Sequence, residues 1–503
     1  MKIDIRKIAV TLLAVVFVTT ACDDTLDINQ DPNNPESSTT AFTLPVAEAS
    51  IAVMMNLDLG IMTGFLNQYW TQAFQASQYQ VYDNYTYNGN QTSTAWLHAY
   101  AWALEDLKFV RDQAIEDGTP NYEAVSILLS AYTYQMLVDV WDEVPFDEAL
   151  QGKDGNLNPS YDDGQEVYDG LINMVDEALA LIDLSPTAIN PGSEDFLMGG
   201  DMNMWIKFAN TLKLRIYMRQ ALARPSVAQA GIQQLETDGA AFIEAGEDVM
   251  VPFPGGSNNE NPLYRGDVST LGLSGLNINA SNTIINFFNA QGDPRIDFYF
   301  DAPTTGTSVG THVGINQGDG VTQTGGTPIS DTSIPSSTNI VAPTSSVYFI
   351  NGFESLFLQA EAQERGWLSG SAATTYAEAV QEAFTFAGMT ASAAAFTGAG
   401  GNYEYPTGGS QAERLEMIAI QKWIALCGIN NVESWAESRR NNYFNNVTGA
   451  GSLLDLSQSS AGTGASLNGS QFPLRALYPV SEISTNPNAT PNGNIGDGVW
   501  WIQ

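Results

Sequence analysis

RLEMIAIQKWIALCGINNVESWAESRR, residues 414–440, carries the clearest structural signal in this chain of 503 residues. Residues 417–427 are apolar on almost every side, and a helix of that kind belongs inside a protein. Gly428 can adopt the left-handed conformation that ends a helix. Asn430 suits an N-cap, and Glu433 follows it at the spacing of a capping box. The stretch therefore predicts two buried helices joined by a tight turn, a structural hairpin with no chemistry of its own.

Trp435 and Arg439 lie four residues apart in the second predicted helix, so the guanidinium can rest on the indole face. Upstream, the helical periodicity of apolar residues recurs many times. It predicts helices over residues 44–59, 64–77, 95–116, 122–141, 165–182, 205–222, 228–245, 352–366, 372–387, 411–427 and 432–441. Strand patterns are confined to short stretches near residues 249–253 and 296–300.

Most of the later helices form consecutive antiparallel pairs. The pairs are 95–116 with 121–141, 205–222 with 228–245, 352–366 with 372–387, and 411–427 with 432–441. They resemble degenerate tetratricopeptide units, which stack because one pair cannot bury its apolar face alone. We therefore expect a mainly α fold, an α/α superhelix of tetratricopeptide-like helix pairs with long irregular insertions and little β structure. The longest insertion, residues 301–346, has seven glycines and no aromatic residue.

The composition limits the possible functions. There are 56 acidic and 19 basic residues, which give a formal net charge of −37. A nucleic-acid-binding protein needs a basic footprint, so that class is excluded. With two His and two Cys, the chain cannot form a His/Cys metal cluster. The sequence contains no G-x-S-x-G element, no P-loop and no H-E-x-x-H motif. We therefore predict no cofactor and no enzymatic activity.

The N-terminal residues have the pattern of a secretory signal. Lys2, Arg6 and Lys7 precede an apolar run over residues 8–20, which is too short to span a bilayer. The run ends in Thr-Thr-Ala followed by Cys22, which looks like a bacterial lipobox. Such a signal implies cleavage before Cys22 and acylation of that cysteine, and an ordinary secretory signal cleaved nearby is the alternative.

We accordingly expect residues 1–21 to be a lipoprotein signal peptide, residues 22–40 a flexible tether and residues 41–503 a single domain. The tether is polar and carries two prolines. Removing residues 1–21 takes away three basic residues and one acidic residue, which changes the formal net charge from −37 to −39. No later segment has about 18 uninterrupted apolar residues, so no second membrane element is predicted.

Several motifs, in one order along nearly the whole chain, give it a resemblance to a known family. They are the lipobox followed by DINQDPNNP, DVWDEVPFDEAL (139–150), WIKFANTLKLRIYMR (205–219), GDPR (292–295), FESLFLQAEA (353–362), IQKWIAL…ESWAESRR (420–440) and FPLRALYPVSEISTNPN (472–488). Together they resemble the SusD/RagB family of outer-membrane lipoproteins, and most closely its SusD-like, starch-binding-associated branch.

The resemblance implies a fold, a partner and a function. The fold would be four tetratricopeptide-like helix pairs. The protein would be a lipid-anchored protein of the outer membrane, exposed at the cell surface of a Gram-negative bacterium. It would capture oligosaccharide and deliver it to a SusC-like TonB-dependent transporter, on which it would sit as a hinged lid. The large negative charge favours a neutral polysaccharide, such as a β-glucan.

A sugar site needs exposed aromatic rings for stacking, with amides and carboxylates nearby to bond the hydroxyls. The best match is the stretch 65–102, which holds 11 aromatic residues in 38. Its helix-borne Phe65, Trp70, Phe74 and Trp102 are expected in the core. The predicted ligand contacts lie in or beside its polar break and are Tyr79, Tyr82, Asp83, Asn84, Tyr85, Tyr87, Asn88 and Trp96. The alternative is that these tyrosines staple the loop onto the helices.

Two further candidate regions supply weaker signals. Arg295 and Tyr299 lie in the stretch 264–300, where a pairing of Arg295 with Asp293 or Asp297 can also be purely structural. Tyr403 and Tyr405 lie in a Gly-rich insertion between helix pairs.

Other functions and sites stay open on the sequence. A lipidated helical-repeat protein can bind peptides, as RagB-type relatives suggest. A surface glycoside hydrolase would need a pair of carboxylates, which so acidic a chain can supply. His98 is expected to be a packed or capping residue, whereas His312 can be a ligand contact. A structural calcium ion could bind an Asp/Asn-rich loop such as 318–320, although EF-hand spacing is absent.

Overall fold

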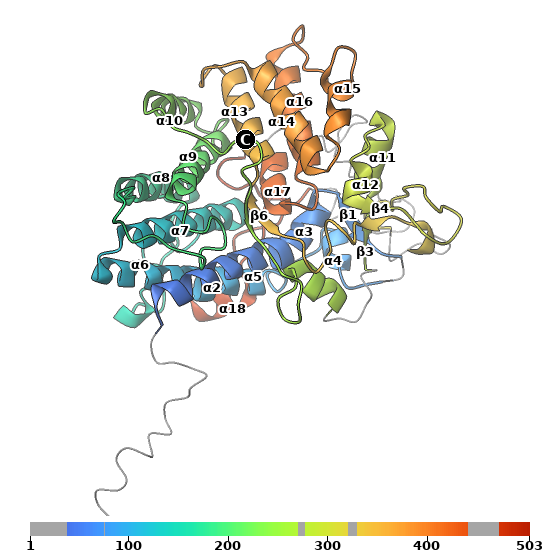
Figure 1. Ribbon diagram of the computed structural model, residues 1–503. Coiled ribbons are helices and arrows are strands. Elements are labelled where there is room, and N and C mark those ends of the chain that lie inside the picture. Colours follow the sequence, from blue (N-terminus) through green and yellow to red (C-terminus); the bar gives the residue numbers. More distant parts are fainter. Residues whose placement is uncertain (1–37, 75, 270–276, 320–328, 441–471, 503) are drawn as a thin grey trace, which may run out of the picture.

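The computed structural model describes residues 38–74, 76–269, 277–319, 329–440 and 472–502 (Figure 1). The predicted signal peptide, Cys22 and nearly all of the predicted tether lie outside these residues. The α-helices are α2 (Thr40–Val53), α3 (Leu59–Leu66), α4 (Gln80–Asp83), α5 (Ser93–Leu97), α6 (Glu105–Asp117), α7 (Pro120–Trp141), α8 (Gly164–Leu181), α9 (Met202–Arg219), α10 (Pro225–Thr237), α11 (Asn282–Gln291), α12 (Ile296–Tyr299), α13 (Gly352–Glu364), α14 (Ala372–Phe386), α15 (Ala393–Thr397), α16 (Gln411–Ala425), α17 (Asn431–Arg440) and α18 (Val480–Thr485).

Other helical segments connect or extend these helices. The π-helical segments are η1 (Met54–Asp58), η2 (His98–Leu104) and η4 (Tyr264–Ser269), and the 3₁₀ turns are η3 (Gly152–Asp154), η5 (Ile329–Asp331) and η6 (Thr390–Ser392). Segment η1 joins α2 to α3, and η2 joins α5 to α6. π-Helical turns are rare in proteins, and those that occur often lie at functional sites.

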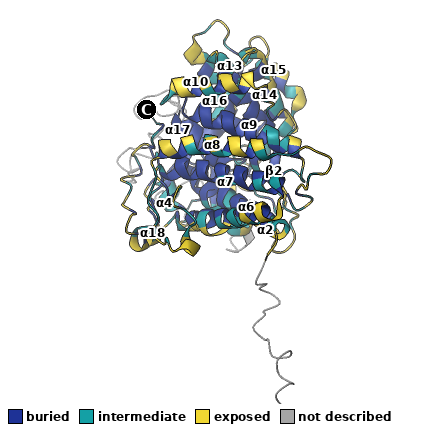
Figure 2. Cartoon of the chain, turned by 90° about the vertical axis from the view of Figure 1, so that its left-hand side faces the viewer, coloured by how far each residue is buried: buried dark blue, intermediate teal, exposed yellow. Residues whose placement is uncertain are grey.

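The helices stack side by side, as the consecutive helix pairs in the sequence predict. Helix α6 packs on α7, α7 on α8, α8 on α9 and α9 on α10, and a second stack runs through α13, α14, α16 and α17 (Figure 1). Helix α9 also packs on α13, and α17 packs on α3 and α7, so the two stacks share one interior. Figure 2 shows α7 dark blue in the centre and an exposed yellow stripe along α8. The mainly α fold of stacked pairs is confirmed.

Some predicted elements are wrong in extent or type. Residues 44–59 and the start of 64–77 form one helical run that ends at Leu66, and the chain then enters strand β1. Helix α10 ends at Thr237 rather than at residue 245, because Gly239 takes a φ of 68°. The predicted strand near 296–300 is mostly helix α12, and only Phe300 enters a strand.

The helical run Thr40–Leu66 is the described helix that has the length and hydropathy to cross a membrane. In its most apolar window, 72% of the residues are buried inside the protein. It thus forms part of the core.

The strands are short and pair in three two-stranded antiparallel sheets among the described residues. Strand β1 (Trp70–Gln72) pairs with β3 (Ile278–Ala280), Trp70 opposite Ala280. Strand β2 (Val249–Val251), within the predicted 249–253, pairs with β6 (Val347–Ile350), and β4 (Phe300–Asp301) pairs with β5 (Ile334–Pro335). These sheets attach the insertions to the helical body. In the long insertion 301–346, Asp331 further accepts a 2.9 Å hydrogen bond from Ser308 N.

The hairpin at residues 414–440 forms α16 and α17 and is buried as predicted. Gly428 has a φ of 71°, and the Arg439 guanidinium lies 3.5 Å from the centre of the Trp435 ring. Asn430 Oδ1 accepts from Glu433 N at 3.1 Å, so the predicted N-cap is present. The Glu433 carboxylate, however, does not close a capping box, because it bonds to cations of other helices.

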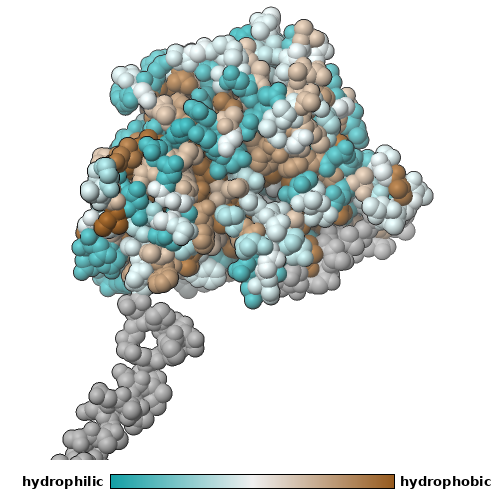
Figure 3. Space-filling view, viewed as in Figure 1, coloured by the Kyte–Doolittle hydropathy of each residue, from teal (hydrophilic) through white to brown (hydrophobic). Residues whose placement is uncertain are grey.

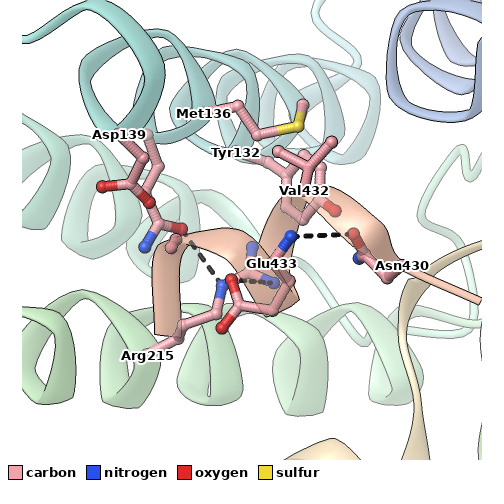
Figure 4. A pocket seen from close by; sticks show the side chains of 9 residues that line it. Tyr132, Met136, Asp139, Arg215, Asn430, Val432 and Glu433 are labelled. Carbon is pink, nitrogen blue, oxygen red and sulfur yellow. Dashed lines mark hydrogen bonds and ion pairs between the residues drawn. The ribbon is translucent and has the colours of Figure 1, made fainter. Parts of the chain in front are cut away.

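A buried ion network joins these helices. Arg219 on α9 lies 3.2 Å from Asp139 on α7 and 2.6 Å from Glu433 on α17. Lys422 on α16 lies 3.1 Å from Glu433, and Arg215 lies 3.8 Å from it (Figure 4). The network is made of the cations Arg215, Arg219, Arg365, Lys422 and Arg440 and the anions Asp139, Glu354, Glu361, Glu433 and Glu437.

The environment shifts the pKa values of two carboxyl groups of this network in opposite directions. Burial opposes ionisation of Glu361, but Arg440 and Arg365 outweigh it and lower its pKa to about 2. Burial and the nearby Glu433 raise the pKa of Glu354 to about 7. The cavity beside them, shown in Figure 4, has a volume of about 10 Å³. That is at most the space of one water molecule, so it is no ligand site.

Candidate functional site

Most of the predicted contacts in the polar break turn inward. Tyr79 donates a 2.7 Å hydrogen bond to Asp267, and Tyr87 donates one of 2.7 Å to the carbonyl oxygen of Arg475. Tyr85 is fully buried and accepts from Gln68 at 3.1 Å. These rings hold the loop against the helical body, which is the alternative to ligand contact.

Asp83 is also buried. It accepts hydrogen bonds from Thr71 Oγ1 and Gln317 Nε2, each at 2.8 Å, and from Gly318 N at 3.0 Å. Burial raises the pKa of Asp83 to about 7, although these bonds favour its charged form. Its role in the structure is to hold the residues 317–318 against the polar break.

The second and third candidate regions meet in the interior. Arg295 forms an ion pair of 2.6 Å with Asp293, and its guanidinium lies 4.2 Å from the centre of the Phe384 ring. Tyr403 donates to the same aspartate at 2.7 Å, and Tyr299 donates to the Ala425 carbonyl oxygen at 3.1 Å. Arg295, Tyr299 and Tyr403 are buried. The structural reading of the Asp293–Arg295 pair is confirmed, and these side chains present no face to a ligand at the surface.

Tyr405 is a buried ring at the edge of this interior, and its hydroxyl bonds to Glu364. Among the rings assigned to the core, Phe65 and Trp70 are buried and Phe74 is half-buried. Trp102 is 45% exposed, so its assignment to the core is wrong. It lies on η2 and lines a surface hollow together with residues of α2.

Trp96 borders a surface groove of about 440 Å³, here called the Trp96 groove. Helix α5 and η2 form one wall, the segment 145–159 forms the second, and α18 with the residue after it forms the third. The lining residues are Trp96, Tyr100, Ala101, Glu105, Pro145, Ala149, Leu150, Gln151, Gly152, Asn156, Leu157, Pro159, Glu482, Thr485 and Asn486. The volume is within the range of small-ligand sites in proteins.

The aromatic lining residues of the Trp96 groove are Trp96, which is 8% exposed, and Tyr100, which is half-buried. The Trp96 ring centre lies 4.8 Å from that of Tyr100 and 6.4 Å from that of Tyr161, which is nearly parallel to it. Tyr478 packs against both Trp96 and Tyr161, at 5.9 Å and 4.9 Å. This mutual packing holds the rings in place, and rigid rings are suited to stack on the flat face of a sugar.

Amides and carboxylates surround these rings. Gln151, Asn156 and Glu482 are half-buried at the groove wall. Tyr161 donates a 3.0 Å hydrogen bond to Glu482, and burial together with that carboxylate raises the pKa of Tyr161. None of the described lining residues is a Lys or Arg. Lys153 comes nearest in sequence and forms a 3.4 Å ion pair with Glu105. The groove is therefore suited to hydroxyl-rich neutral ligands.

The backbone around the groove is pinned by local hydrogen bonds. Asp162 Oδ2 accepts from Phe146 N at 2.8 Å and from Asp147 N at 3.0 Å, and Glu148 accepts from Ser160 N at 2.8 Å. These bonds close the segment 145–162 into a fixed loop, so its lining residues keep their positions without a ligand.

The polar break adjoins the same groove. Thr92 donates to the Leu477 carbonyl oxygen at 2.8 Å, three residues before α18 begins. Asn88 and Asn90 are exposed on this loop, while Asn84, Gln91 and Tyr82 are half-buried. Of the residues predicted to contact a ligand, Trp96 lines the groove, and Asn88 and Tyr82 belong to the loop beside it.

Sequence reasoning missed several lining residues, among them Tyr100, Asn156, Leu157, Glu482 and Asn486. Two of them, Glu482 and Asn486, lie in the motif 472–488, where residues 480–485 form helix α18. Glu482, an acidic residue in the first turn of α18, is a helix-start signal that the sequence contains.

The two histidines make protein contacts. His98 is buried, bonds to Asp58 and packs edge-on against Trp102 at 4.3 Å, as its predicted packed role requires. His312 lies 2.8 Å from Asp297 and 3.2 Å from Ser333. Within the described residues, no group of three or more His, Cys, Asp or Glu side chains is placed to hold a metal ion. A calcium ion near 318–320 stays a prediction.

Comparison with known proteins gives a family and a fold. The model of the SusD-like family, described as starch-binding and associating with the outer membrane, matches residues 32–479. Among curated protein sequences, none matches this chain. A solved chitin-binding protein is 21% identical with a TM-score of 0.74, and the match covers 92% of this chain and all of that one.

Two further solved structures share the fold. A SusD homologue from Bacteroides uniformis is 21% identical with a TM-score of 0.73, over 92% of this chain and 99% of the other. A chitin-binding SusD homologue from Flavobacterium johnsoniae is 20% identical with a TM-score of 0.70, over 90% of this chain and 98% of the other.

Proposed function

Since this chain belongs to the SusD-like family, whose members are described as starch-binding and associating with the outer membrane, we propose that it is a surface-exposed lipoprotein that captures glycan for import. It binds oligosaccharide or polysaccharide and delivers it to a SusC-like TonB-dependent transporter. It holds the sugar without cleaving it.

The Trp96 groove is the observation that carries the proposal. It combines rigid aromatic rings with amide and carboxylate side chains, which is the chemistry that recognises the apolar face and the hydroxyls of a sugar. In this proposal Trp96 and Tyr100 contact the sugar ring. Gln151, Asn156 and Glu482 bond its hydroxyls, and Asn88 extends the site along the adjoining loop.

The charge of the groove supports a neutral glycan. Glu105 and Glu482 line it, and none of the described lining residues is a free cation that would attract a uronate. A β-glucan fits this chemistry. N-acetylated sugars fit it as well, and two of the solved structures that share the fold are described as chitin-binding.

The lipobox-like residues before Cys22 support the anchor. Acyl chains on that cysteine would hold the protein at the outer membrane through about 0.8 kcal/mol for each buried methylene. Residues 23–37 would then connect the anchor to the helical body.

Calorimetry on the purified full chain tests the glycan assignment. The panel consists of β-glucan, starch, mannan, xylan and chitin oligosaccharides, with alginate as an acidic glycan and a tryptic peptide mixture as a non-glycan. We expect binding to at least one neutral glycan, no binding to alginate and no release of reducing sugar. Micromolar binding of peptides without any glycan binding would replace the proposal with a peptide-uptake role.

A variant that fills the Trp96 groove tests the site. Ala101 is an exposed residue of η2 that lines the groove, so Ala101→Arg places a long side chain in it. We expect the glycan affinity to fall at least about tenfold, or about 1.4 kcal/mol. Ala412→Arg is the matched control, because Ala412 is an exposed helical alanine on α16 outside the groove. Equal affinities of both variants would place the site elsewhere.

A further inference from the structure

A second surface groove lies beside the Trp96 groove. Its volume is about 450 Å³, close to that of the Trp96 groove, which is about 440 Å³. Its lining residues come from α6, from α7, from Met174 of α8 and from the loop 146–150. This surface is here called the α6 groove. Its volume is also within the range of small-ligand sites in proteins.

The two grooves meet at Ala149 and Leu150, which line both of them. Both residues are half-buried, so part of each side chain is open to solvent between the grooves. Tyr100 donates a 2.7 Å hydrogen bond to the Pro145 carbonyl oxygen, which attaches the start of the loop to η2. The loop is thus fixed where it separates the grooves, and a ligand that passes over Ala149 and Leu150 enters both.

Leu150 has an unusual backbone conformation for its residue type. Its φ is 61°, in the left-handed region that glycine adopts without strain and that residues with a side chain rarely adopt. The chain keeps a leucine here although glycine would relieve the strain. Strained residues of this kind cluster at ligand-binding sites, where the surrounding structure holds them in place. The conformation of Leu150 is therefore evidence, independent of the groove volumes, that the crossing between the grooves has a function.

The aromatic side chains of the two grooves pack in one row. Tyr100 lines the Trp96 groove, and its ring centre lies 6.3 Å from that of Tyr134, which lines the α6 groove. The Tyr134 ring centre in turn lies 4.8 Å from that of Phe146, with the ring planes nearly perpendicular. Tyr134 is buried and Phe146 is half-buried. An extended ligand therefore meets fixed apolar surface on both sides of Leu150.

Charged side chains supply polar groups to the α6 groove without giving it a net positive charge. Lys108 pairs with Asp112, and the Arg111 guanidinium lies 2.5 Å from Glu177. Lys and Arg carry more N–H donors than one carboxylate accepts, so donors remain for hydroxyl groups. The surface over α6 to α8, at the left of Figure 3, shows apolar and hydrophilic residues side by side. Such a lining suits an uncharged, hydroxyl-rich chain better than an acyl chain or an anion.

We propose that the two grooves form one binding site, in which a linear neutral glycan crosses Leu150 and occupies both grooves at once. The inference rests on the proposed function and narrows its ligand to long chains. Each groove alone has the volume for a ligand of about disaccharide size, so a chain of about four or more sugar residues is needed to fill both. Leu150 packs on the sugar at the crossing and keeps the chain on the path between the grooves.

Calorimetry on the purified full chain tests the dependence on glycan length. The probes are soluble β-glucan, starch, mannan, xylan and chitin oligosaccharides, each series running from disaccharide to octasaccharide. For a series that binds, we expect the affinity to rise at least about tenfold from the disaccharide to the hexasaccharide and then to level off. Equal affinities along every binding series would overturn the two-groove site and leave the proposed function in place. No binding of any series would overturn both.

A variant that fills the α6 groove separates the two grooves. Asp147 is exposed and lines the α6 groove but not the Trp96 groove, so Asp147→Arg obstructs only the second half of the site. We expect the affinity for the hexasaccharide to fall at least about tenfold, to that of the disaccharide, while the disaccharide binds as to wild type. Glu416→Arg is the matched control, because it makes the same change of charge at an exposed position of α16 outside both grooves.

A second variant tests the crossing itself. Leu150→Gly removes the side chain between the grooves, and because glycine adopts a φ of 61° freely, the thermal midpoint should stay near that of wild type. We expect the hexasaccharide affinity again to fall about tenfold. Leu184→Gly, at an exposed leucine outside both grooves, is the control and should bind as wild type. Wild-type hexasaccharide affinity in both Asp147→Arg and Leu150→Gly would overturn the inference, and a loss in Ala101→Arg alone would confine the glycan to the Trp96 groove.

Discussion

Arg219 illustrates how single side chains organise this protein. It is completely buried, and its guanidinium contacts carboxylates on α7 and α17. Separating charges from water costs several kcal/mol per ion, so such a network is tolerated only when every charge has a partner. Apart from Arg365, the residues of the network lie in the motifs at 139–150, 205–219, 353–362 and 420–440. The charged residues of those motifs therefore identify the family through its interior.

Replacing Glu433 by Gln should destabilise the fold strongly. The substitution leaves Arg219 and Lys422 buried with one anion fewer, and breaking a buried pair on one side costs about 3–5 kcal/mol. Urea unfolding followed by circular dichroism measures the loss. Asp112→Asn, which breaks the exposed pair with Lys108, is the control and should change stability by less than about 1 kcal/mol. Equal stabilities of the two variants would show that the network contributes nothing.

At the residue scale, local contacts were predictable and distant ones were not. The Trp435–Arg439 stack follows from their spacing of four residues on one helix, and it is present. The capping box proposed for Glu433 has only its backbone half. Its carboxylate is taken by Arg219, which is more than 200 positions away in the chain. A local pattern cannot show that competing partner.

The helices and strands fit together through a few close contacts between small and large residues. Helix α3 passes over strand β1 at Gly64, where an added Cβ would lie 2.3 Å from the Trp70 ring. Trp70 is buried, so it has no room to move away. The glycine thus sets the spacing between the first helical run and the first sheet.

Gly64→Ala should therefore lower stability by about 1–3 kcal/mol, as expected for overpacking a fixed core. Alanine is the better helix former by about 1 kcal/mol, so a stabilising result would mean that Trp70 moves aside. Thermal unfolding decides between the two. Gly256→Ala is the control, since no atom lies within 4 Å of the added Cβ at that position, and it should be neutral.

Pairs of helices were the most predictable elements. The long periodic patterns at 95–116 and 122–141 correspond to the run α5–η2–α6 and to α7, because burial of one apolar face is encoded within each segment. The short helices α11, α12 and α18 were missed or read as strands. Their few residues acquire helical structure through the long-range contacts that bury them, which the sequence pattern does not show.

At the scale of the whole molecule, the net negative charge lies outside the buried ion network. The buried ion network is balanced, with five cations and five anions. The formal net charge of −37 is therefore carried by the remaining residues of the chain. An acidic exterior opposes binding of uronates and keeps the body from associating with itself.

Cys22→Ser should release the protein from the membrane. Without the thiol there is no acyl chain to anchor the body, so the variant should appear in the soluble fraction and take up no radiolabelled palmitate. Thr20→Ser keeps the cysteine and should stay labelled and membrane-bound. Palmitate incorporation into the Cys22→Ser chain would contradict the proposed anchor.

The sequence alone was enough for the helical class, the pairing of the helices, the buried hairpin at 414–440 and the family. Each of these depends on apolar periodicity and motifs that are contained in short stretches. Only the tertiary structure decided which aromatic rings are covered by distant segments and which border a groove. Tyr79, Tyr85 and Tyr87 lie in a polar stretch yet are covered, because Asp267 and residues of the C-terminal segment pack over them. Trp96 borders a groove because segments 145–159 and 482–486, far away in the chain, form its other walls.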